Sequence, residues 1–287
     1  MHLAFSSMNN PSDPHPAELA RALEERGYES LWYGEHSHIP CSRQTPYPPG
    51  GDMPEPYKHM MDPYLSLMTA AGATTHLKLG TGIALLMERD LFSQAKTIAT
   101  LDRLSGGRVI IGTGVGWNQE GFENANPHPF NKRYAVLRET VAATRALWRD
   151  EEAGYEGQYV RFDPVWSYPK PLQPGGPKIF LGAMGPLGRR HAAAWADGWY
   201  PVDVALADPE KEISAFRESV RALGRDPEDV EINVQIMDTS NLDGLKYFRD
   251  LGVQRATIGV SMEVWDQPET VMPMIDRFAR VIPELRD

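Results

Sequence analysis

Residues 97–122 of the chain read TIATLDRLSGGRVIIGTGVGWNQEGF, a run that predicts a helix, a strand and a glycine-rich turn in succession. Ile98 and Leu101 recur at helical spacing in its first part, which indicates an amphipathic helix. The helix should end at residues 105–107 (SGG), because glycine readily adopts the left-handed conformation found at helix C-termini. Residues 109–111 (VII) form a β-branched run that is typical of a strand buried on both faces of a parallel sheet.

The glycine turn at residues 112–116 (GTGVG) removes side chains at the end of that strand, so that another group can approach the backbone closely. A Rossmann dinucleotide site needs GxGxxG spacing and a helix directly after the glycines, whose N–H groups bind the pyrophosphate. Here the spacing is GxGxG, and residues 118–129 are rich in Asn and Pro and predict a loop without a helix. We therefore interpret the turn either as a packing turn or as the floor under a flat ring.

A strand followed by a helix recurs along the whole chain. The expected strands are residues 2–6, 30–34, 77–83, 109–111, 178–181, 199–200, 230–236 and 255–260. The expected helices are residues 16–26, 62–75, 97–104, 131–149, 186–196, 209–223, 241–251 and 269–281. Eight such units over 287 residues predict an α/β fold, a (β/α)8 TIM barrel formed as one domain by residues 1–287, rather than an open doubly wound sheet.

Two long loops interrupt this rhythm, residues 35–61 after the second strand and residues 118–129 after the fourth. The first contains six prolines together with Tyr47 and Tyr57, and it is either a lid over a binding site or a disordered segment. A TIM barrel carries its active site on the loops that follow its strands. Both loops therefore belong to the predicted site.

Composition excludes several classes of partner. The net charge of −10 disfavours binding to nucleic acid or to an anionic membrane surface. No apolar run approaches the roughly 18 residues that span a bilayer, and the N-terminus lacks the features of a signal peptide. Cys41 is the one cysteine, which fits a cytoplasmic protein. We expect a small-molecule substrate.

Glu35 and His36 directly follow the second strand, and His36 forms an HxH pair with His38. Such a pair can bind a metal, but the later strand exits offer no further histidine, so we predict no metal site. His36 could instead hydrogen-bond a substrate or exchange a proton with it. The alternative is a histidine at the barrel rim without a role.

Two further strand exits carry glycines. Residues 81–83 (TGI) end the third strand, and glycine there permits a β-bulge of the kind found near active sites. Residues 182–190 (GAMGPLGRR) join a strand to the start of a helix, where backbone N–H groups and the helix dipole attract phosphate. The alternative for the second segment is an ordinary turn with solvated arginines.

Four segments together resemble the luciferase-like monooxygenase superfamily and, within it, the F420-dependent oxidoreductases. They are SLWYGEH at residues 30–36, LKLGTGIALL at 77–86, AKTIATLDRLSGGRVIIGTGVGWNQEGF at 95–122 and LGAMGPLGRRHAAAWADGWYP at 181–201. The resemblance implies a TIM barrel that binds coenzyme F420, or alternatively FMN, at the C-terminal ends of its strands.

The resemblance also implies the parts of the cofactor site. The ring would lie against the bulge formed by Thr81, Gly82 and Ile83, with a cis peptide between Gly82 and Ile83, and Gly114 and Gly116 would allow its close approach. The phosphate would lie at residues 182–190, on the following residues: Gly182, Met184, Gly185, Arg189 and Arg190.

His36 corresponds to a histidine implicated in catalysis near the reactive ring carbon, with Glu35 as its possible orienting partner. Sugar-phosphate dehydrogenases of the superfamily carry a catalytic glutamate where this chain has Trp117, and whether Glu120 replaces that glutamate is left open. Trp117 and Tyr47 are predicted to contact an apolar or aromatic substrate rather than a sugar phosphate.

The expected function is hydride transfer between F420 and an unidentified apolar or aromatic small molecule, by a homodimer. An FMN-dependent monooxygenase is the alternative with the same fold. A flavin-binding protein without catalytic activity and a metal hydrolase are the alternatives from other classes.

Overall fold

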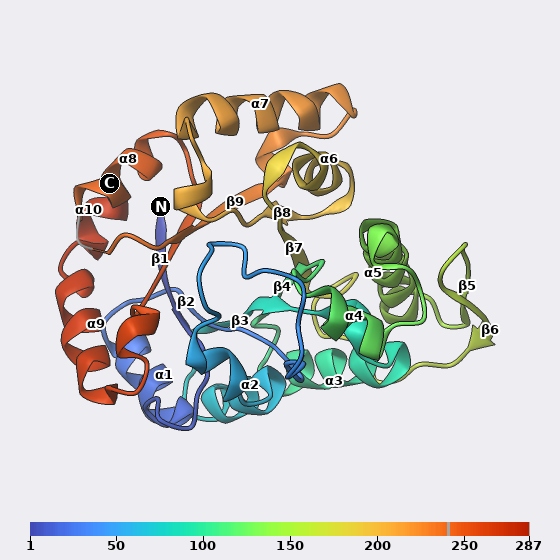
Figure 1. The fold of residues 1–287 in the computed structure, drawn as a ribbon, viewed down its shortest axis with the longest axis horizontal. Coiled ribbons are helices and arrows are strands. Elements are labelled where there is room, and N and C mark those ends of the chain that lie inside the picture. Colours follow the sequence, from blue (N-terminus) through green and yellow to red (C-terminus); the bar gives the residue numbers. More distant parts are fainter. Residues whose placement is uncertain (240–241, 287) are drawn as a thin grey trace.

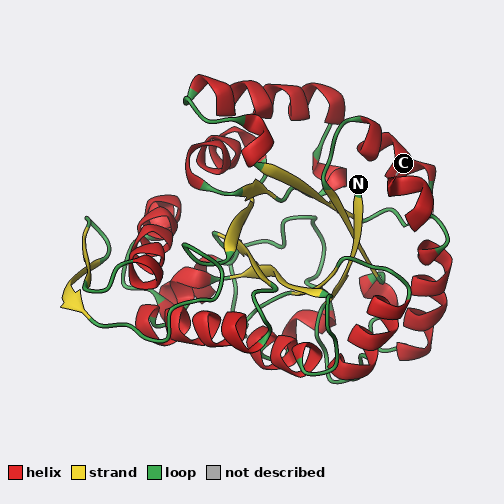
Figure 2. Ribbon diagram, turned by 180° about the vertical axis from the view of Figure 1, so that it is seen from behind, coloured by secondary structure: helices red, strands yellow, loops and turns green. Residues whose placement is uncertain are grey.

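The computed structural model describes residues 1–239 and 242–286, and it contains a closed barrel of eight parallel strands (Figures 1 and 2). In order around the barrel the strands are β1 (His2–Ser7), β10 (Arg255–Gly259), β9 (Glu231–Ile236), β8 (Gly198–Trp199), β7 (Lys178–Gly182), β4 (Val109–Gly114), β3 (Lys78–Ala84) and β2 (Ser30–Tyr33). The predicted (β/α)8 architecture is therefore confirmed.

Helices surround the barrel on the outside (Figure 2). They are α1 (Pro16–Glu25), α2 (Pro63–Ala71), α3 (Leu91–Leu104), α5 (Arg133–Arg149), α6 (Gly185–Trp195), α7 (Pro209–Ala222), α8 (Asp243–Asp250), α9 (Val271–Ala279) and α10 (Ile282–Arg286). An antiparallel hairpin, β5 (Ala153–Glu156) and β6 (Arg161–Val165), projects from the side of the barrel (Figure 1). The start of α8 predicted at Asn241 lies outside the described residues. Across the part of the chain that is described, helices long and apolar enough to span a bilayer are absent.

The run 97–122 forms the elements that its sequence predicts. α3 ends at Leu104, and Gly106 and Gly107 adopt φ values of 74° and 80°, the left-handed conformation that glycine tolerates. Every residue of β4 is buried, because the strand pairs with β3 on one side and β7 on the other while helices cover its outer face.

The prediction that no helix follows the glycine turn is wrong. Helix α4 (Gln119–Ala125) begins directly after Asn118, whose side-chain oxygen accepts a hydrogen bond of 2.6 Å from the Gly121 N–H. Asparagine is a strong N-cap, and this local signal outweighs the Asn- and Pro-rich composition of the segment. A Rossmann site is excluded by the closed parallel barrel rather than by the absence of a helix.

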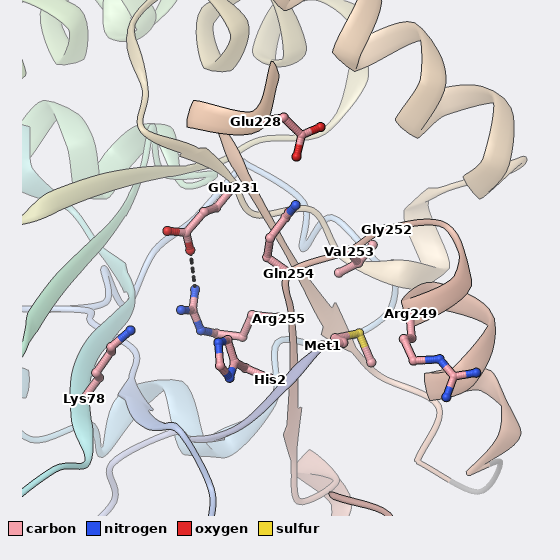
Figure 3. Close-up of a pocket in the computed structure, with 10 residues that line it drawn as sticks. All are labelled: Met1, His2, Lys78, Glu228, Glu231, Arg249, Gly252, Val253, Gln254 and Arg255. Atoms are coloured by element: carbon pink, nitrogen blue, oxygen red, sulfur yellow. Dashed lines mark hydrogen bonds and ion pairs between the residues drawn. The ribbon is translucent and has the colours of Figure 1, made fainter. Parts of the chain in front are cut away.

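A pocket opens at the N-terminal ends of the strands, the end of the barrel opposite the predicted site (Figure 3). Its lining residues are Met1, His2, Lys78, Glu228, Glu231, Arg249, Gly252, Val253, Gln254 and Arg255. Arg255 is 1% exposed and makes two hydrogen bonds of 2.7 Å to Glu29 and one of 3.3 Å to Glu231. These charges neutralise one another, so we assign this end of the barrel a structural role.

Candidate functional site

The predicted site residues lie at the C-terminal ends of four strands that are consecutive in the barrel, in the order β7, β4, β3 and β2. They are Glu35 and His36 after β2, Tyr47 in the loop that follows, Thr81, Gly82 and Ile83 in β3, Gly114, Gly116 and Trp117 at the end of β4, and Gly182, Met184, Gly185, Arg189 and Arg190 at the end of β7. The fold therefore brings together segments that are far apart in the sequence, on one arc of the barrel mouth.

The bulge predicted in β3 is present. The pairing register between β3 and β4 shifts between Thr81 and Ala84, and the peptide bond between Gly82 and Ile83 is cis. A Cβ atom at Gly82 would lie 3.2 Å from the Tyr200 hydroxyl, so the bulge rests on an aromatic side chain inside the barrel. The Tyr200 hydroxyl in turn donates a hydrogen bond of 2.8 Å to Gln235. Tyr200 was not predicted as a site residue, although its place at the end of a short predicted strand was a usable signal.

Gly114 at the end of β4 and Gly116 just beyond it leave room for the side chains of Ile83 in β3 and Glu88 in the turn that follows β3. A Cβ atom at Gly114 would lie 2.0 Å from Cδ1 of Ile83. Gly116 has a φ of 67°, and a Cβ atom there would lie 3.3 Å from a carboxylate oxygen of Glu88. Both glycines were predicted to admit a cofactor, and in this structure the groups that approach them are protein side chains.

His36 is part of a cluster of four rings. Its imidazole lies 5.3 Å from the Tyr57 ring and 6.3 Å from the Trp117 ring, both edge to face. Tyr47 contacts Trp117 at 5.6 Å and Tyr57 at 5.7 Å. The predicted catalytic histidine therefore lies beside both predicted substrate-contacting residues, and Tyr57 completes the group.

Burial in this cluster lowers the pKa of His36 to about 4, and the nearby His38 lowers it further in the same direction. Desolvation disfavours the charged form of an imidazole, so His36 is neutral at pH 7. A neutral imidazole accepts a proton or a hydrogen bond, whereas donation as imidazolium is disfavoured.

Glu35 has a different set of partners. One carboxylate oxygen accepts a hydrogen bond of 2.9 Å from the Leu85 N–H, and the other accepts from the Arg89 guanidinium. Arg89 also donates to Asp62, the N-cap of α2, at 2.6 Å. Within residues 1–239 and 242–286 no hydrogen bond joins Glu35 to His36, so Glu35 anchors the exit of β3 rather than the imidazole.

Residues 35–61, which we call the lid, are tied to α4 by Glu120. This carboxylate accepts hydrogen bonds from the Thr45 N–H at 3.0 Å, from the Thr45 hydroxyl at 2.7 Å and from the Gln44 N–H. The Thr45 hydroxyl and these N–H groups lower the pKa of Glu120 to about 2. Glu120 is therefore engaged with the lid, and the two long loops predicted separately form one cover over the site.

The Glu120→Gln substitution is expected to loosen the lid, since an amide oxygen accepts these hydrogen bonds more weakly than a carboxylate. We expect faster deuterium uptake and faster protease cleavage at residues 43–47, by about tenfold. Because the pKa of Glu120 is depressed, the contact is complete above about pH 4.5 and is lost as the pH falls through about 2. Glu123→Gln, an exposed change on the same helix, is the control, and equal exchange in both variants contradicts the assignment.

The segment predicted to bind phosphate starts helix α6. Gly185 has a φ of 74°, and Met184 at the N-cap makes no side-chain capping bond, so the first N–H groups of the helix face outward without a cap. Arg189 pairs with Glu212 of α7, whereas the Arg190 side chain is exposed. The helix terminus and Arg190 are thus the groups available to an anion, and Arg189 is held by a carboxylate.

Among residues 1–239 and 242–286, no group of three or more His, Cys, Asp or Glu side chains is placed to hold a metal ion.

Comparison with known proteins gives relatives over most of the chain. An uncharacterized protein of Mycobacterium tuberculosis is 37% identical over 268 residues, covering 91% of this chain and 92% of that protein. An F420-dependent glucose-6-phosphate dehydrogenase of Mycolicibacterium gilvum is 32% identical over 234 residues, covering 79% of this chain and 65% of that protein.

Solved structures share the fold. An F420-dependent secondary alcohol dehydrogenase, solved with an F420–acetone adduct, superposes with a TM-score of 0.75 at 20% identity, covering 100% of this chain and 99% of that one. The family model described as luciferase-like monooxygenase matches residues 8–238. With four strand exits arranged as that resemblance implies, the chain belongs to the luciferase-like monooxygenase family.

Proposed function

We propose that this protein is an oxidoreductase that transfers a hydride between coenzyme F420 and a small, uncharged apolar or aromatic molecule. The proposal rests on the arrangement of the strand ends from β2 to β7. The bulge of β3 lies between the ring cluster around His36 and the uncapped start of α6. The F420-dependent relatives support the choice of cofactor.

The residues present fit such a cofactor. On the side where a side chain of Gly82 would project, the bulge packs against Tyr200 and Trp32, and we place the flat ring against its backbone. The uncapped N-terminus of α6 and Arg190 provide donors for a phosphate group. F420, when bound, supplies the hydride acceptor or donor.

The chain's own residues would handle the proton and the substrate. Neutral His36 is suited to accept a proton from the substrate or to hydrogen-bond its polar atom. Trp117, Tyr47 and Tyr57 would exclude water and pack against an apolar substrate. Arg89 is already engaged by Glu35 and Asp62, which supports an uncharged substrate over a sugar phosphate.

The test is a binding titration of the purified protein with F420 and with FMN, followed by absorbance or fluorescence. We expect F420 to bind more tightly than FMN. Arg190→Ala should weaken F420 binding by about tenfold, because a charge-assisted hydrogen bond contributes about 1.5–3 kcal/mol before solvent screening. Arg221→Ala on α7 is the matched control. Unchanged F420 binding in Arg190→Ala would contradict the placement of the phosphate at the start of α6.

An FMN-dependent monooxygenase is the second candidate, because the matching family model is described as luciferase-like monooxygenase. Tight binding of FMN together with no measurable affinity for F420 would select it.

We also propose that the protein is a homodimer. Phe92 and Leu104 of α3 are 41% and 65% exposed, and Trp166, in the segment that follows β6, is 75% exposed. That segment is held against α3 by a 3.4 Å hydrogen bond from Arg103 to the Lys170 carbonyl. Apolar surface of this kind favours association. Light scattering on the eluted protein should give twice the monomer mass, and Trp166→Ser should shift it toward the monomer.

A further inference from the structure

Glu88 is a partly buried carboxylate at the barrel mouth to which the proposed function gives no role. It ends the 3-10 helix η2 (Leu86–Glu88), the first turn after β3. Its backbone N–H donates to the Leu85 carbonyl, and within the described residues the influences on its carboxylate are partial burial and the charge of Glu35. Partial burial without a cationic partner disfavours the charged form of a carboxylate.

The glycines of β4 show where this carboxylate lies. A Cβ atom at Gly112 would meet the Thr81 carbonyl oxygen first and then Trp32, which packs inside the barrel with Phe180. A Cβ atom at Gly114 would meet the side chain of Ile83, and one at Gly116 would meet the side chain of Glu88. Gly112 and Gly114 face the same side of β4, whereas Gly116 lies in the turn beyond the strand, with a φ of 67°. Glu88 therefore lies at the barrel mouth beside this turn, two residues beyond the glycine that faces Ile83, the residue of the bulge against which we place the ring.

The surroundings of Glu88 favour its protonated form. The side chain of Leu85 lies beside it at Gly116, and the charged group that affects its pKa is the Glu35 carboxylate, which is itself paired with Arg89. Burial raises the pKa of Glu88 to about 7, and the charge of Glu35 adds to this. At neutral pH the group is therefore about half protonated and can serve as either donor or acceptor.

We propose that Glu88 contacts the bound cofactor ring above Ile83 and takes up a proton when the ring binds. The inference rests on the proposed function, because it needs a ring on the β3 bulge. A ring placed there removes the remaining water from the carboxylate, and F420 adds negative charge through its phosphate. Both effects favour the protonated carboxylic acid, which can then donate a hydrogen bond to a carbonyl oxygen of the ring.

The experiment compares F420 affinity between pH 6 and 8.5 in the wild-type protein, Glu88→Gln and Glu123→Gln. Glutamine preserves the shape and the donor of a protonated Glu88 but cannot ionise. We expect the dissociation constant of the wild type, relative to that of Glu88→Gln, to rise at least about threefold over this range. Glu123→Gln should follow the wild type, and the ionisation of F420 itself cancels because all three proteins bind the same ligand.

Calorimetry in two buffers of different ionisation enthalpy gives a second readout, which follows proton uptake directly. At pH 7 the wild type should take up roughly half a proton per F420 bound, beyond the uptake of Glu88→Gln where that variant folds. Parallel pH profiles, or no proton uptake by the wild type, would overturn the role of Glu88 while leaving the proposed function intact. Failure to bind either F420 or FMN would overturn both.

Discussion

Replacing Arg255 with glutamine is expected to lower the free energy of unfolding by about 3–5 kcal/mol, the usual cost of removing one partner from a buried ion pair. Arg255 is 1% exposed and reaches Glu29 with two hydrogen bonds of 2.7 Å, while Glu231 accepts a third. Its guanidinium also lies 5.7 Å from the Trp32 ring inside the barrel. Glutamine keeps part of the volume but removes the buried cation shared by Glu29 and Glu231, which keep only the more exposed Lys78 and Lys178.

Urea unfolding at pH 7 measures this change, with Arg221→Gln on the exposed face of α7 as the control. Burial would by itself raise the pKa of Glu29, but the hydrogen bonds and charges of Arg255 and Lys78 outweigh it and hold that pKa well below its ordinary range. A carboxylate whose pKa is depressed in the folded state contributes its full stabilisation above about pH 4.5, and this contribution is lost as the pH falls further. The difference between wild type and variant should therefore shrink in acid. A loss below about 1 kcal/mol at pH 7 contradicts the prediction.

Replacing Gly112 with alanine is expected to lower the free energy of unfolding by about 1–3 kcal/mol and to displace the bulge of β3. A Cβ atom at Gly112 would lie 2.2 Å from the Thr81 carbonyl oxygen. That oxygen belongs to backbone in the β3–β4 ladder, and the Thr81 hydroxyl donates a 2.7 Å hydrogen bond back to the Gly112 carbonyl. Neither strand can move without breaking these bonds, so the bulge itself should shift.

The measurement pairs urea unfolding with an F420 titration, because a displaced bulge should also weaken ring binding. Gly244→Ala is the matched control: it lies in α8, and apart from its chain neighbours and its own helix backbone no described atom comes within 4 Å of the added methyl group. Alanine in a helix should raise stability there by about 0.5–1 kcal/mol. Equal effects of the two substitutions would contradict the crowding at Gly112.

Close approach at the glycine turn was predicted, with its cause left open between packing and a flat ring. The resemblance placed a cofactor at Gly114 and Gly116. In the structure Gly112 faces the Thr81 carbonyl, Gly114 faces Ile83 and Gly116 faces Glu88. A glycine in the sequence indicates that another group lies close to the backbone, but it does not identify that group, because the neighbouring atoms belong to another part of the chain.

Short-range signals in the sequence were sufficient for the strands and most of the helices, for the glycine end of α3 and for the bulge at residues 81–83. Each depends on side-chain spacing or on backbone preferences within a few residues, which are properties of the local chain. The uncapped start of α6 was visible in the same way.

Only the closed barrel decided which distant groups meet at its mouth. It paired Glu35 with Arg89, Glu120 with the lid and Arg189 with Glu212, and it placed Glu88 beside Gly116, where none of the described residues forms an ion pair with it. These pairings depend on the order and register of the strands around the barrel, and no residue's neighbours in the chain carry that information. The chemistry of each charged group at the site therefore follows from the tertiary fold.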